Sequence, residues 1–340
     1  MKIGLVHRRF TTHGGTERYL VGLARWLVRE GHEVHVLCNE VREDLKQEPG
    51  VRFKHLPMWR PGLAVQMASW WWSARRAEDA ESWDAVMGFG RTPGHQLFRA
   101  GGGSHAAYLR RVHPWRRWVS PTDWLETALD RHAVESAQVV IANSRFCADD
   151  LREDYRAKRV EVVYNGVDLQ RFRPDPEVRR RVRAELGAGG PVAAFVGTGF
   201  WRKGLDVAIA SLPPGFTLWV VGKDTPWPAP EAVKFLGPVQ DVERILQAAD
   251  VMLLPTRYDP FANVCLEAMA CGIPALTTPD TGAAEVLPEP WMVCRSPDAF
   301  RQALQRVDPE LGLRCRAVAE NHTPAASYSR AFELLKEAVR

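Results

Sequence analysis

The sequence contains no long hydrophobic run and no regular cysteine framework. Its longest apolar stretches, such as 63–72 and 251–255, are far shorter than the roughly 20 residues of a bilayer-spanning helix. The six cysteines form no Cys-x-x-Cys pair, which argues against structural zinc and predicts reduced thiols inside a core. No signal-peptide core follows the first residue, so we expect a cytoplasmic protein.

Acidic residues are absent from one window of the chain. Residues 85–122 contain none, whereas six arginines fall there: Arg91, Arg99, Arg110, Arg111, Arg116 and Arg117. Residues 1–168 carry the whole formal excess of +4, with 25 Lys and Arg against 21 Asp and Glu. These counts predict a local basic patch in the first half. The patch is too short to indicate a nucleic-acid partner.

Two doubly wound α/β domains are expected from the element pattern. The 340 residues, 46% hydrophobic and 25% charged, have ordinary globular composition and suggest two domains. Residues 1–37 have the pattern of a β-α-β unit, in which a helix with one apolar face separates two short strands. The pattern begins again at Val192 after a charged, proline-bearing segment, 165–191, that we interpret as a linker. Ligands of such sheets bind beyond the carboxyl ends of the strands, which predicts a shared cleft.

The predicted boundaries divide the chain into three parts. Residues 1–168 form an N-terminal, acceptor-side Rossmann-like domain, and residues 169–322 form a C-terminal nucleotide-sugar-binding domain. Residues 323–340 form a last helix that we expect to pack back on the N-terminal domain. The oligomeric state is not encoded in any pattern of this sequence.

In each domain, one glycine-bearing loop follows the first strand. Gly14 and Gly15 open the first helix, where backbone amides can receive an anion, although a plain tight turn has the same pattern. The loop 197–204 carries Arg202 and Lys203, a guanidinium fork and an ammonium that can neutralise a diphosphate. A solvated basic loop is the alternative.

Two carboxylates stand eight positions apart in the second domain. Asp259 closes a loop after an apolar strand, and Glu267 lies on the following helix, ahead of the run Ala-Met-Ala-Cys-Gly-Ile-Pro at 268–274. This spacing would let two acids hold two ligand hydroxyls. Either acid could equally be a residue that interacts favourably with the helix dipole, or a solvent-exposed surface residue.

These motifs together resemble the retaining family-4 glycosyltransferases of GT-B fold. The resemblance rests on the Asp-x7-Glu segment, the Arg-Lys-Gly loop at 202–204, Asn-Gly-Val-Asp at 165–168 and the loop at Gly14, in the order expected for the family. The pattern Gly-x-x-Phe-x-Arg-Lys-Gly is most similar to lipopolysaccharide core glucosyltransferases. The fold implied is GT-B, two Rossmann-like domains that face each other across a cleft.

The resemblance implies roles for particular residues. Arg202 and Lys203 would bind the donor diphosphate, Glu267 the ribose hydroxyls, and Asp259 the donor sugar, while His105 would be the polar group near the transferred sugar. The donor-binding set would comprise Gly14, Gly15, Gly197, Arg202, Lys203, Asn263, Val264 and Glu267. No metal and no cofactor are implied, and the sequence has no Asp-x-Asp pair.

Two positions depart from the family pattern. Asp259 stands where the family usually has Glu, one methylene longer, which puts sugar choice and any nucleophilic role in doubt. The acidic residue that relatives often carry near His105 is missing from the glycine run 101–103, so a loop histidine without a role is the alternative.

Tryptophans beside the basic window suggest a membrane surface. Six of them cluster there: Trp59, Trp70, Trp71, Trp72, Trp115 and Trp118. Tryptophan flanked by arginine is typical of a peripheral protein on an anionic leaflet, whereas burial in a core is the alternative. We therefore expect peripheral contact with the cytoplasmic face of the inner membrane.

The sequence predicts a metal-independent, retaining glycosyltransferase. It would transfer a hexose, with glucose as the first choice, from a UDP-sugar donor to a lipopolysaccharide-core or other surface-glycan acceptor, free or lipid-linked. Two alternatives remain: a nucleotide-sugar epimerase on the same scaffold, and a catalytically silent binding protein at the membrane surface.

Overall fold

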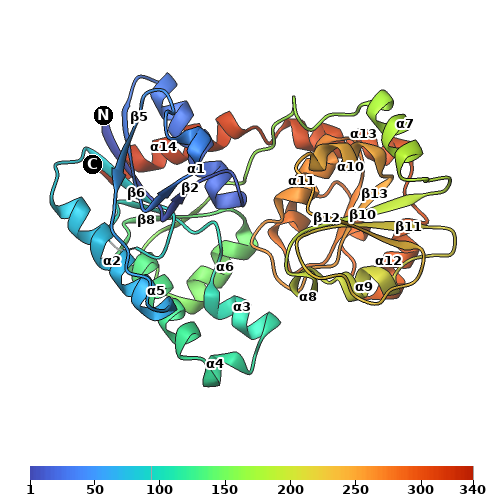
Figure 1. Ribbon diagram of the computed structural model, residues 1–340, viewed down its shortest axis with the longest axis horizontal. Helices are drawn as coiled ribbons and strands as arrows, with labels where there is room; N and C mark the ends of the chain where they lie inside the picture. The colour runs from blue at the N-terminus through green and yellow to red at the C-terminus, as the bar shows by residue number, and fades with distance from the viewer. Residues whose placement is uncertain (93, 340) are drawn as a thin grey trace. The chain divides into compact units, whose positions relative to one another are not determined.

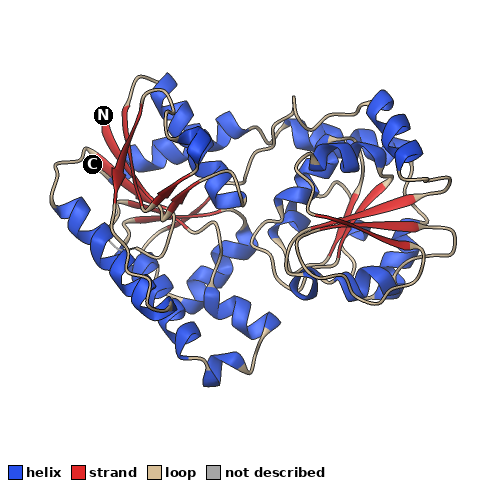
Figure 2. Cartoon of the chain, viewed as in Figure 1, coloured by secondary structure: helices blue, strands red, loops and turns tan. Residues whose placement is uncertain are grey.

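The computed structural model describes residues 1–92 and 94–339 and divides the chain into two compact units. The N-terminal unit comprises Met1–Tyr164 and the chain from Ala325 onward, and the C-terminal unit comprises Asn165–Pro324. Each unit has its own parallel sheet with helices on both faces (Figures 1 and 2). Within the described residues, no helix is both long and apolar enough to cross a bilayer.

The N-terminal sheet has seven parallel strands in the order β5-β3-β1-β6-β7-β8-β9. These strands are β1 (Lys2–Val6), β3 (Glu33–Cys38), β5 (Val51–His55), β6 (Ala85–Gly88), β7 (Leu97–Arg99), β8 (Val139–Ala142) and β9 (Val160–Val162). A small parallel pair, β2 (Arg9–Phe10) and β4 (Glu40–Val41), lies beside it. The central strands are apolar because helices cover both of their faces. The strand order reverses beside β1, which is where such sheets bind ligands.

Helices of the N-terminal unit connect these strands. They are α1 (Gly15–Arg29), the 3-10 turn η1 (Glu43–Leu45), α2 (Leu63–Asp79), α3 (His105–Val112), α4 (Arg116–Val119), α5 (Pro121–Ser136) and α6 (Arg145–Asp154). Helix α1 shows the expected amphipathic pattern, since Leu20, Leu23 and Leu27 are buried against the sheet. The β-α-β pattern of residues 1–37 correctly located α1 between β1 and β3.

The last helix, α14 (Pro324–Ala338), packs on α1 of the N-terminal unit. Its residues Leu334 and Leu335 belong to the same core cluster as Leu20. Gly22 of α1 allows this close approach, because a Cβ there would lie 2.0 Å from the hydroxyl of Tyr328. The chain thus ends in the unit in which it began, with α14 beside α1 in Figure 1.

The C-terminal sheet has five parallel strands in the order β12-β11-β10-β13-β14. They are β10 (Val192–Val196), β11 (Thr217–Val221), β12 (Val233–Gly237), β13 (Val251–Leu254) and β14 (Ala275–Thr277). The helices are α7 (Pro176–Glu185), α8 (Phe200–Lys203), α9 (Leu205–Ala210), α10 (Val242–Ala248), α11 (Asn263–Ala270), α12 (Pro297–Leu304) and α13 (Pro309–Glu320), with 3-10 turns η2 (Gly282–Val286) and η3 (Pro290–Met292). Here the order reverses between β10 and β13.

The segment interpreted as a linker is folded, and that interpretation was wrong. Asp175 caps α7 by accepting hydrogen bonds from the amides of residues 177 and 178, as an N-cap aspartate before proline does. Arg179 and Arg183 of α7 both pair with Asp250, which precedes β13. Two arginines of the segment interpreted as a linker therefore anchor α7 to the C-terminal unit.

Candidate active site

The loop after β10 places two cations at the carboxyl end of the C-terminal sheet. Gly199 begins the single turn α8 with a φ of 80°, and Gly204 ends it with a φ of 79°. Both values lie in the left-handed region that glycine adopts without strain. A Cβ on Gly204 would also lie 1.9 Å from the carbonyl oxygen of Pro255, just after β13. The loop is thereby pressed against the neighbouring strand, and its last two side chains, Arg202 and Lys203, face that strand's end.

Arg202 and Lys203 converge on one carboxylate, that of Asp259. The Lys203 ammonium lies 2.5 Å from Oδ2 of Asp259, and a guanidinium nitrogen of Arg202 lies 3.3 Å from the same oxygen. Arg202 also donates to the backbone carbonyl of Tyr258 at 2.9 Å. Lys203 is buried, and its aliphatic stem lies along Gly197, where a Cβ would be 3.2 Å from Cε. Both cations are therefore held in fixed positions before any ligand arrives.

The Asp259 carboxylate has all of its hydrogen-bonding directions occupied. Its second oxygen, Oδ1, accepts from the amides of Phe261 and Ala262 at 3.1 and 2.6 Å. Burial alone would raise the pKa of this carboxyl, but the charges of Lys203 and Arg202 prevail and hold the pKa well below its ordinary value. Asp259 is thus ionised across the physiological range and organises the cation pair and the turn into α11.

The turn ends in a strained residue that sets the direction of α11. Ala262 has a φ of 55°, the one positive value among the described non-glycine residues, and such strain persists where surrounding contacts impose it. Helix α11 then begins at Asn263, whose side-chain oxygen accepts from Asn165 at 2.6 Å. Val264 and Glu267 follow on α11 and are buried. Asn263 and Glu267, four positions apart, share one face of the helix.

Gly14 and Gly15 open α1 at the carboxyl end of β1. Gly14 has a φ of 106°, and an oxygen of Glu17 lies 2.5 Å from where its Cβ would be. The glycine run after β7 lies beside the start of this helix, since a Cβ on Gly101 would be 2.7 Å from Oγ1 of Thr16. Glycine is favoured at position 14 because of its positive φ, whereas the atoms near Gly101 are ends of side chains that can move.

His105 is the first residue of α3 and lies between carboxylates that no sequence pattern had linked to it. Its Nε2 lies 3.1 Å from Asp123, its Nδ1 lies 3.3 Å from Glu126, and its backbone amide donates to Asp130 at 3.0 Å. The three acids come from one face of α5, as their spacing of three and four residues allows. The acidic partner missing from the glycine run is thus supplied by a later helix.

A cavity of about 510 Å³ opens within the N-terminal unit at its strand-order reversal. The segments that leave β1, β6 and β7 line it at 7–9, 89–91 and 100–103. The start of α1 and side chains of α2 and α5 complete its wall. The volume lies in the range of small-molecule sites. His105 borders this region through Glu126 and Asp130, both of which line the cavity.

Comparison with protein families identifies the chain. Residues 13–171 match the family described as Glycosyltransferase Family 4, and residues 190–307 match the family described as Glycosyl transferases group 1. The chain belongs to the family-4 glycosyltransferases of GT-B fold. The predictions of family, fold and retaining glycosyltransferase activity are confirmed.

Relatives and solved structures agree with this assignment over most of the chain. A probable transglycosylase of Burkholderia thailandensis is 28% identical over 297 residues, which is 84% of this glycosyltransferase and 80% of the relative. The structure of WaaG, a glycosyltransferase involved in lipopolysaccharide biosynthesis, superposes with a TM-score of 0.77 at 22% identity and covers 99% of this chain and 98% of its own. Anabaena HepE in complex with UDP-glucose gives 0.75 at 19% identity, covering 99% and 100%.

The predicted site residues of this glycosyltransferase fall into two groups. Arg202, Lys203 and Asp259 are in direct contact, Gly197 lies against Lys203, and α11, which begins just beyond the Asp259 turn, carries Asn263, Val264 and Glu267. Gly14, Gly15 and His105 belong to the N-terminal unit and do not line its cavity themselves, although the next residues of α1, Thr16 and Glu17, do. Asp123, Glu126 and Arg8 were missed. Two sequence features could have indicated them: the spacing of three and four residues between the acids of α5, and the Arg8-Arg9 pair that follows the first strand.

The His105 cluster has the composition of a metal site, but its carboxylates pair with arginines. The candidate ligand atoms of His105, Asp123 and Glu126 lie within 4.8 Å of one another. Asp123 accepts from Arg116 at 2.8 Å, and Glu126 lies 3.2 Å from Arg91. A cation would have to compete with these guanidinium groups, so the geometry is that of an ion-pair network around an imidazole.

The basic patch predicted for residues 85–122 is largely neutralised, which corrects that expectation. Arg110 pairs with Asp154, Arg111 with Asp150, and Arg91 and Arg116 with the acids of α5. Arg99 is buried with its guanidinium 3.6 Å from the ring centroid of Tyr19. The compensating acids lie later in the chain, on α5 and α6, so a window count could not include them.

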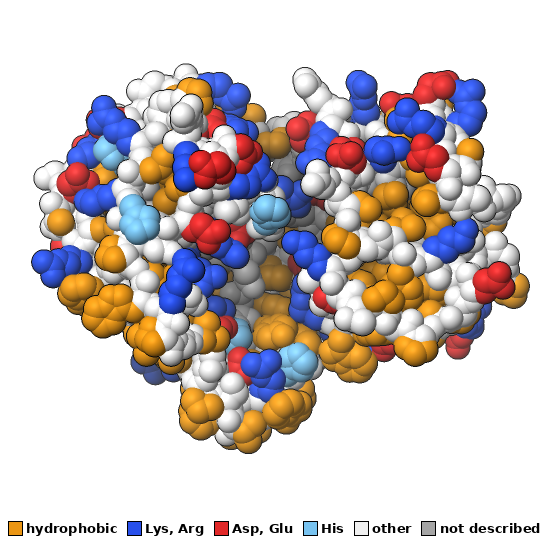
Figure 3. Space-filling model, in the orientation of Figure 1, with side chains coloured by type: hydrophobic (Ala, Val, Ile, Leu, Met, Phe, Trp, Pro, Cys, Tyr) orange, Lys and Arg blue, Asp and Glu red, His pale blue; other side chains and the backbone are white. Residues whose placement is uncertain are grey.

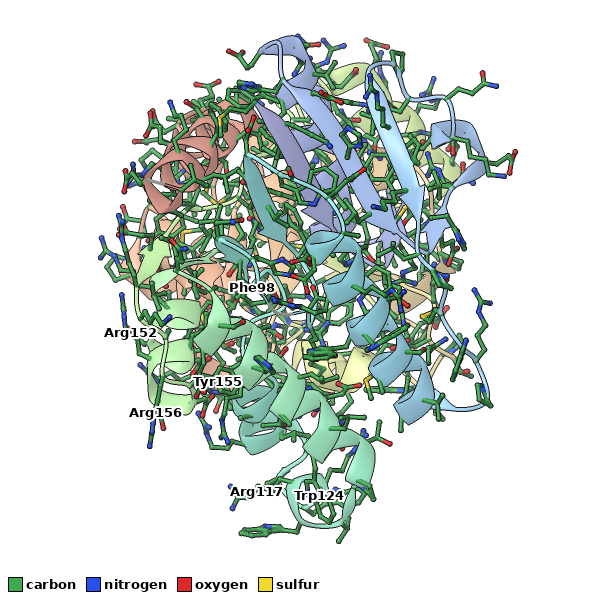
Figure 4. The ribbon with its side chains drawn as sticks, turned by 90° about the vertical axis from the view of Figure 1, so that its left-hand side faces the viewer. Phe98, Arg117, Trp124, Arg152, Tyr155 and Arg156 are labelled. Atoms are coloured by element: carbon green, nitrogen blue, oxygen red, sulfur yellow. The ribbon has the colours of Figure 1, made fainter. Side chains whose placement is uncertain are left out.

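The tryptophans of the N-terminal unit separate into buried and exposed members. Trp70 is buried in a core cluster, which corrects its place in a surface group. Trp115 and Trp118, around the short helix α4, are 64% and 69% exposed. Figure 3 shows apolar side chains gathered over this end of the unit. Figure 4 shows Arg117 and Trp124 together there, where the Trp124 indole donates to the Arg117 carbonyl at 2.7 Å.

Proposed function

We propose that this glycosyltransferase transfers a hexose, with glucose as the first choice, from a UDP-sugar to a lipopolysaccharide-core or other surface-glycan acceptor, without a metal ion. The observation that carries the proposal is the cation pair Arg202 and Lys203, held by Asp259 at the strand-order reversal of the C-terminal sheet. Two adjacent fixed cations match the two phosphates of a nucleoside diphosphate.

The proposed chemistry needs those cations at the leaving group. The bond between the anomeric carbon and the diphosphate oxygen breaks, and the diphosphate keeps the electron pair. The acceptor hydroxyl bonds to the same face of that carbon, and its proton passes to the leaving oxygen. Negative charge grows on the diphosphate in this step, and preoriented cations stabilise it without reorganisation. Arg202 and Lys203 would do what a metal ion does in other transferases.

Asp259 acts in this proposal mainly through the cations. Its carboxylate is engaged by Lys203, Arg202 and two backbone amides, so sugar hydroxyls would meet α11 instead. Glu267, buried on α11, is the proposed partner of the ribose hydroxyls. Asp259 is one methylene shorter than the family's usual Glu, which fits a carboxylate that binds the cation pair and does not extend to the sugar.

The donor and acceptor assignments draw on the likeness to other enzymes. The neighbour HepE holds UDP-glucose, and the neighbour WaaG is involved in lipopolysaccharide biosynthesis. Both likenesses support UDP-glucose and a surface-glycan acceptor as the first pair to test. Incubation of the protein with a panel of UDP-, GDP- and ADP-sugars and a lipopolysaccharide-core fragment should yield transfer from a UDP-hexose with retained anomeric configuration. Absence of transfer from every donor in the panel, despite binding of UDP, would contradict the proposal. A parallel reaction without acceptor would reveal epimerisation.

We also propose peripheral contact with the cytoplasmic face of the inner membrane through the end of the N-terminal unit at α4. Trp115, Trp118 and Val119 are 63–69% exposed there, and Trp124 is 51% exposed. Aromatic side chains at this exposure favour the lipid interface. Substitution of both Trp115 and Trp118 by Ser should abolish sedimentation with phosphatidylglycerol vesicles, whereas Trp59→Ser, at a 71% exposed position outside this cluster, should not. Equal sedimentation of the double variant and of Trp59→Ser would exclude the α4 end as the membrane-binding surface.

A further inference from the structure

Helix α8 is a single turn that is too short to be stable on its own. Its four residues lie between two glycines in the left-handed region, and helices of this length do not persist without outside contacts. The last carbonyls of a helix also have no partners inside it. Because α8 carries both Arg202 and Lys203, contacts from outside the turn must fix where these two cations lie.

The carbonyls at the end of α8 are bound by the loop that follows β13. The Arg202 carbonyl accepts from the amide of Arg257 at 2.8 Å and from the hydroxyl of Thr256 at 3.1 Å. The Trp201 carbonyl accepts from the Arg257 guanidinium at 2.5 Å. Arg257 thus holds two successive carbonyls of α8, one with its backbone and one with its side chain.

The Arg257 guanidinium is itself fixed by two further contacts. Two of its nitrogens lie 2.9 and 2.6 Å from the two oxygens of Asp206 on α9, in the paired geometry that arginine and carboxylates favour. The guanidinium carbon also lies 3.8 Å from the ring centroid of Trp201, which is stacking range. Burial would raise the pKa of Asp206, but the hydrogen bond and the charge of Arg257 lower it. The pair is therefore ionised at neutral pH.

The opposite end of α8 is held from the other neighbouring strand. Asp224, in the loop after β11, accepts a hydrogen bond from the amide of Phe200, the first residue of α8. Strands β11 and β13 flank β10 in the sheet. Loops from the strands on either side therefore hold the two ends of α8, which fixes the turn before a ligand binds.

Arg257 supports the site through α8 and not by contact with its charged groups. Among the residues that the structure describes, its side chain makes no hydrogen bond or ion pair with Arg202, Lys203 or Asp259. Its guanidinium already makes three hydrogen bonds, and it is stacked on an indole. A group engaged in this way is suited to hold the backbone of a neighbouring turn.

We propose that Arg257 is a positioning residue of this glycosyltransferase: paired with Asp206 and stacked on Trp201, it holds the carbonyl end of α8 where the two cations of that turn meet the donor diphosphate. The inference rests on the proposed function, which assigns the diphosphate to Arg202 and Lys203. A misplacement of about 1 Å can slow an enzymatic reaction about 10²-fold, so loss of this support should appear in the transfer rate.

The first test compares Arg257→Met with Arg301→Met as a matched control. Arg301 also pairs with an aspartate, Asp298, and donates to the carbonyl of Ala210, the last residue of α9, but α9 carries neither of the two cations. Steady-state kinetics with a UDP-hexose and a lipopolysaccharide-core fragment measure kcat, and calorimetry measures UDP affinity. Arg257→Met should lower kcat about 10-fold and change UDP affinity less than about 3-fold, because cation alignment matters most in the transition state. Arg301→Met should keep the wild-type values of both.

Further variants distinguish positioning from a general structural role. Arg257→Lys keeps a positive charge beside Asp206 and should recover part of the lost rate. Asp206→Asn, which leaves residue 257 intact, should lower kcat about 3-fold. In an Arg202→Met background, Arg257→Met should cost only about 2-fold more, because a residue that acts through α8 loses most of its effect once a cation of that turn is gone.

Three outcomes would overturn the inference: wild-type kcat in Arg257→Met, equal losses of kcat in Arg257→Met and Arg301→Met, or a further loss of about 10-fold in the Arg202→Met background. The single variant Arg202→Met separates these from failure of the proposed function. If Arg202→Met leaves both UDP affinity and kcat unchanged, the diphosphate assignment itself is wrong. If both fall in Arg202→Met while Arg257→Met behaves as wild type, only the role of Arg257 is wrong.

Discussion

The two strand-order reversals of this molecule have the same topology but a different charge arrangement. At the C-terminal reversal, between β10 and β13, Arg202 and Lys203 share the carboxylate of Asp259 and are pre-positioned. At the N-terminal reversal, beside β1, Arg9 and Arg91 each pair with an acid of their own at the wall of a cavity. A doubly wound sheet thus determines where ligands bind, whereas the loop side chains determine which ligand binds.

Of the variants that test this comparison, the one that removes the Lys203 ammonium should reduce the transfer rate most. Lys203→Met deletes one of the two cations proposed to bind the donor and leaves Asp259 with only Arg202 as a charged partner. We expect transfer to fall about 10²- to 10³-fold, the range for loss of one preorganised charge-stabilising group. Initial rates with a UDP-hexose measure it. Lys234→Met, an exposed lysine on β12, is the control and should keep wild-type rates. Equal transfer rates for Lys203→Met and Lys234→Met would show that Lys203 takes no part in the reaction.

Asp259→Asn separates an organising role from a direct sugar contact. The substitution releases both cations and raises the positive charge of the site, so UDP affinity should stay the same or increase, while kcat falls about 10- to 100-fold because the cations lose their orientation. Steady-state kinetics and UDP calorimetry measure the two effects. A large rise in the donor KM with unchanged kcat would instead indicate that Asp259 holds the sugar.

His105→Asn tests whether the N-terminal reversal takes part in the reaction. His105 is fixed by Asp123 and Glu126, and we expect its loss to lower kcat about 10-fold. UDP affinity should not change, since the cations proposed to bind the donor belong to the other unit. His55→Asn, an exposed histidine on β5, is the matched control. If the two histidine variants have the same kcat, His105 has only a structural role.

The smallest expected effect is on stability in acid. The pKa of Asp259 is lowered in the folded protein, so its contribution is complete above the ordinary carboxyl value of about 4 and is lost as pH falls below that value. The thermal midpoint of Asp259→Asn should lie roughly 4 °C below wild type between pH 5 and 8. The two midpoints should converge as pH falls toward 2. A constant difference down to that pH would contradict the ion-pair explanation.

The sequence predicted the major elements, because their signals are local. The apolar period of α1 and the apolar runs of β10 and β13 each lie within one segment, and they placed the glycine loops and the cation pair at strand ends. Local patterns failed where the partner of a side chain lay elsewhere in the chain. The arginines of α3 and α4 appeared to form a basic patch, and the segment with α7 appeared to be a linker, because Asp150, Asp154 and Asp250 are distant in sequence.

The amino-acid sequence by itself determined the family, the two parallel α/β units and the residue types of the loop at 197–204, since periodicity and short motifs need no knowledge of distant contacts. Only the tertiary structure decided which charges pair with one another. It joined Asp259 to Lys203 across 56 positions and gave His105 its acids from α5. Electrostatic energy depends on distance in space and on burial, and both quantities exist only once the chain has folded.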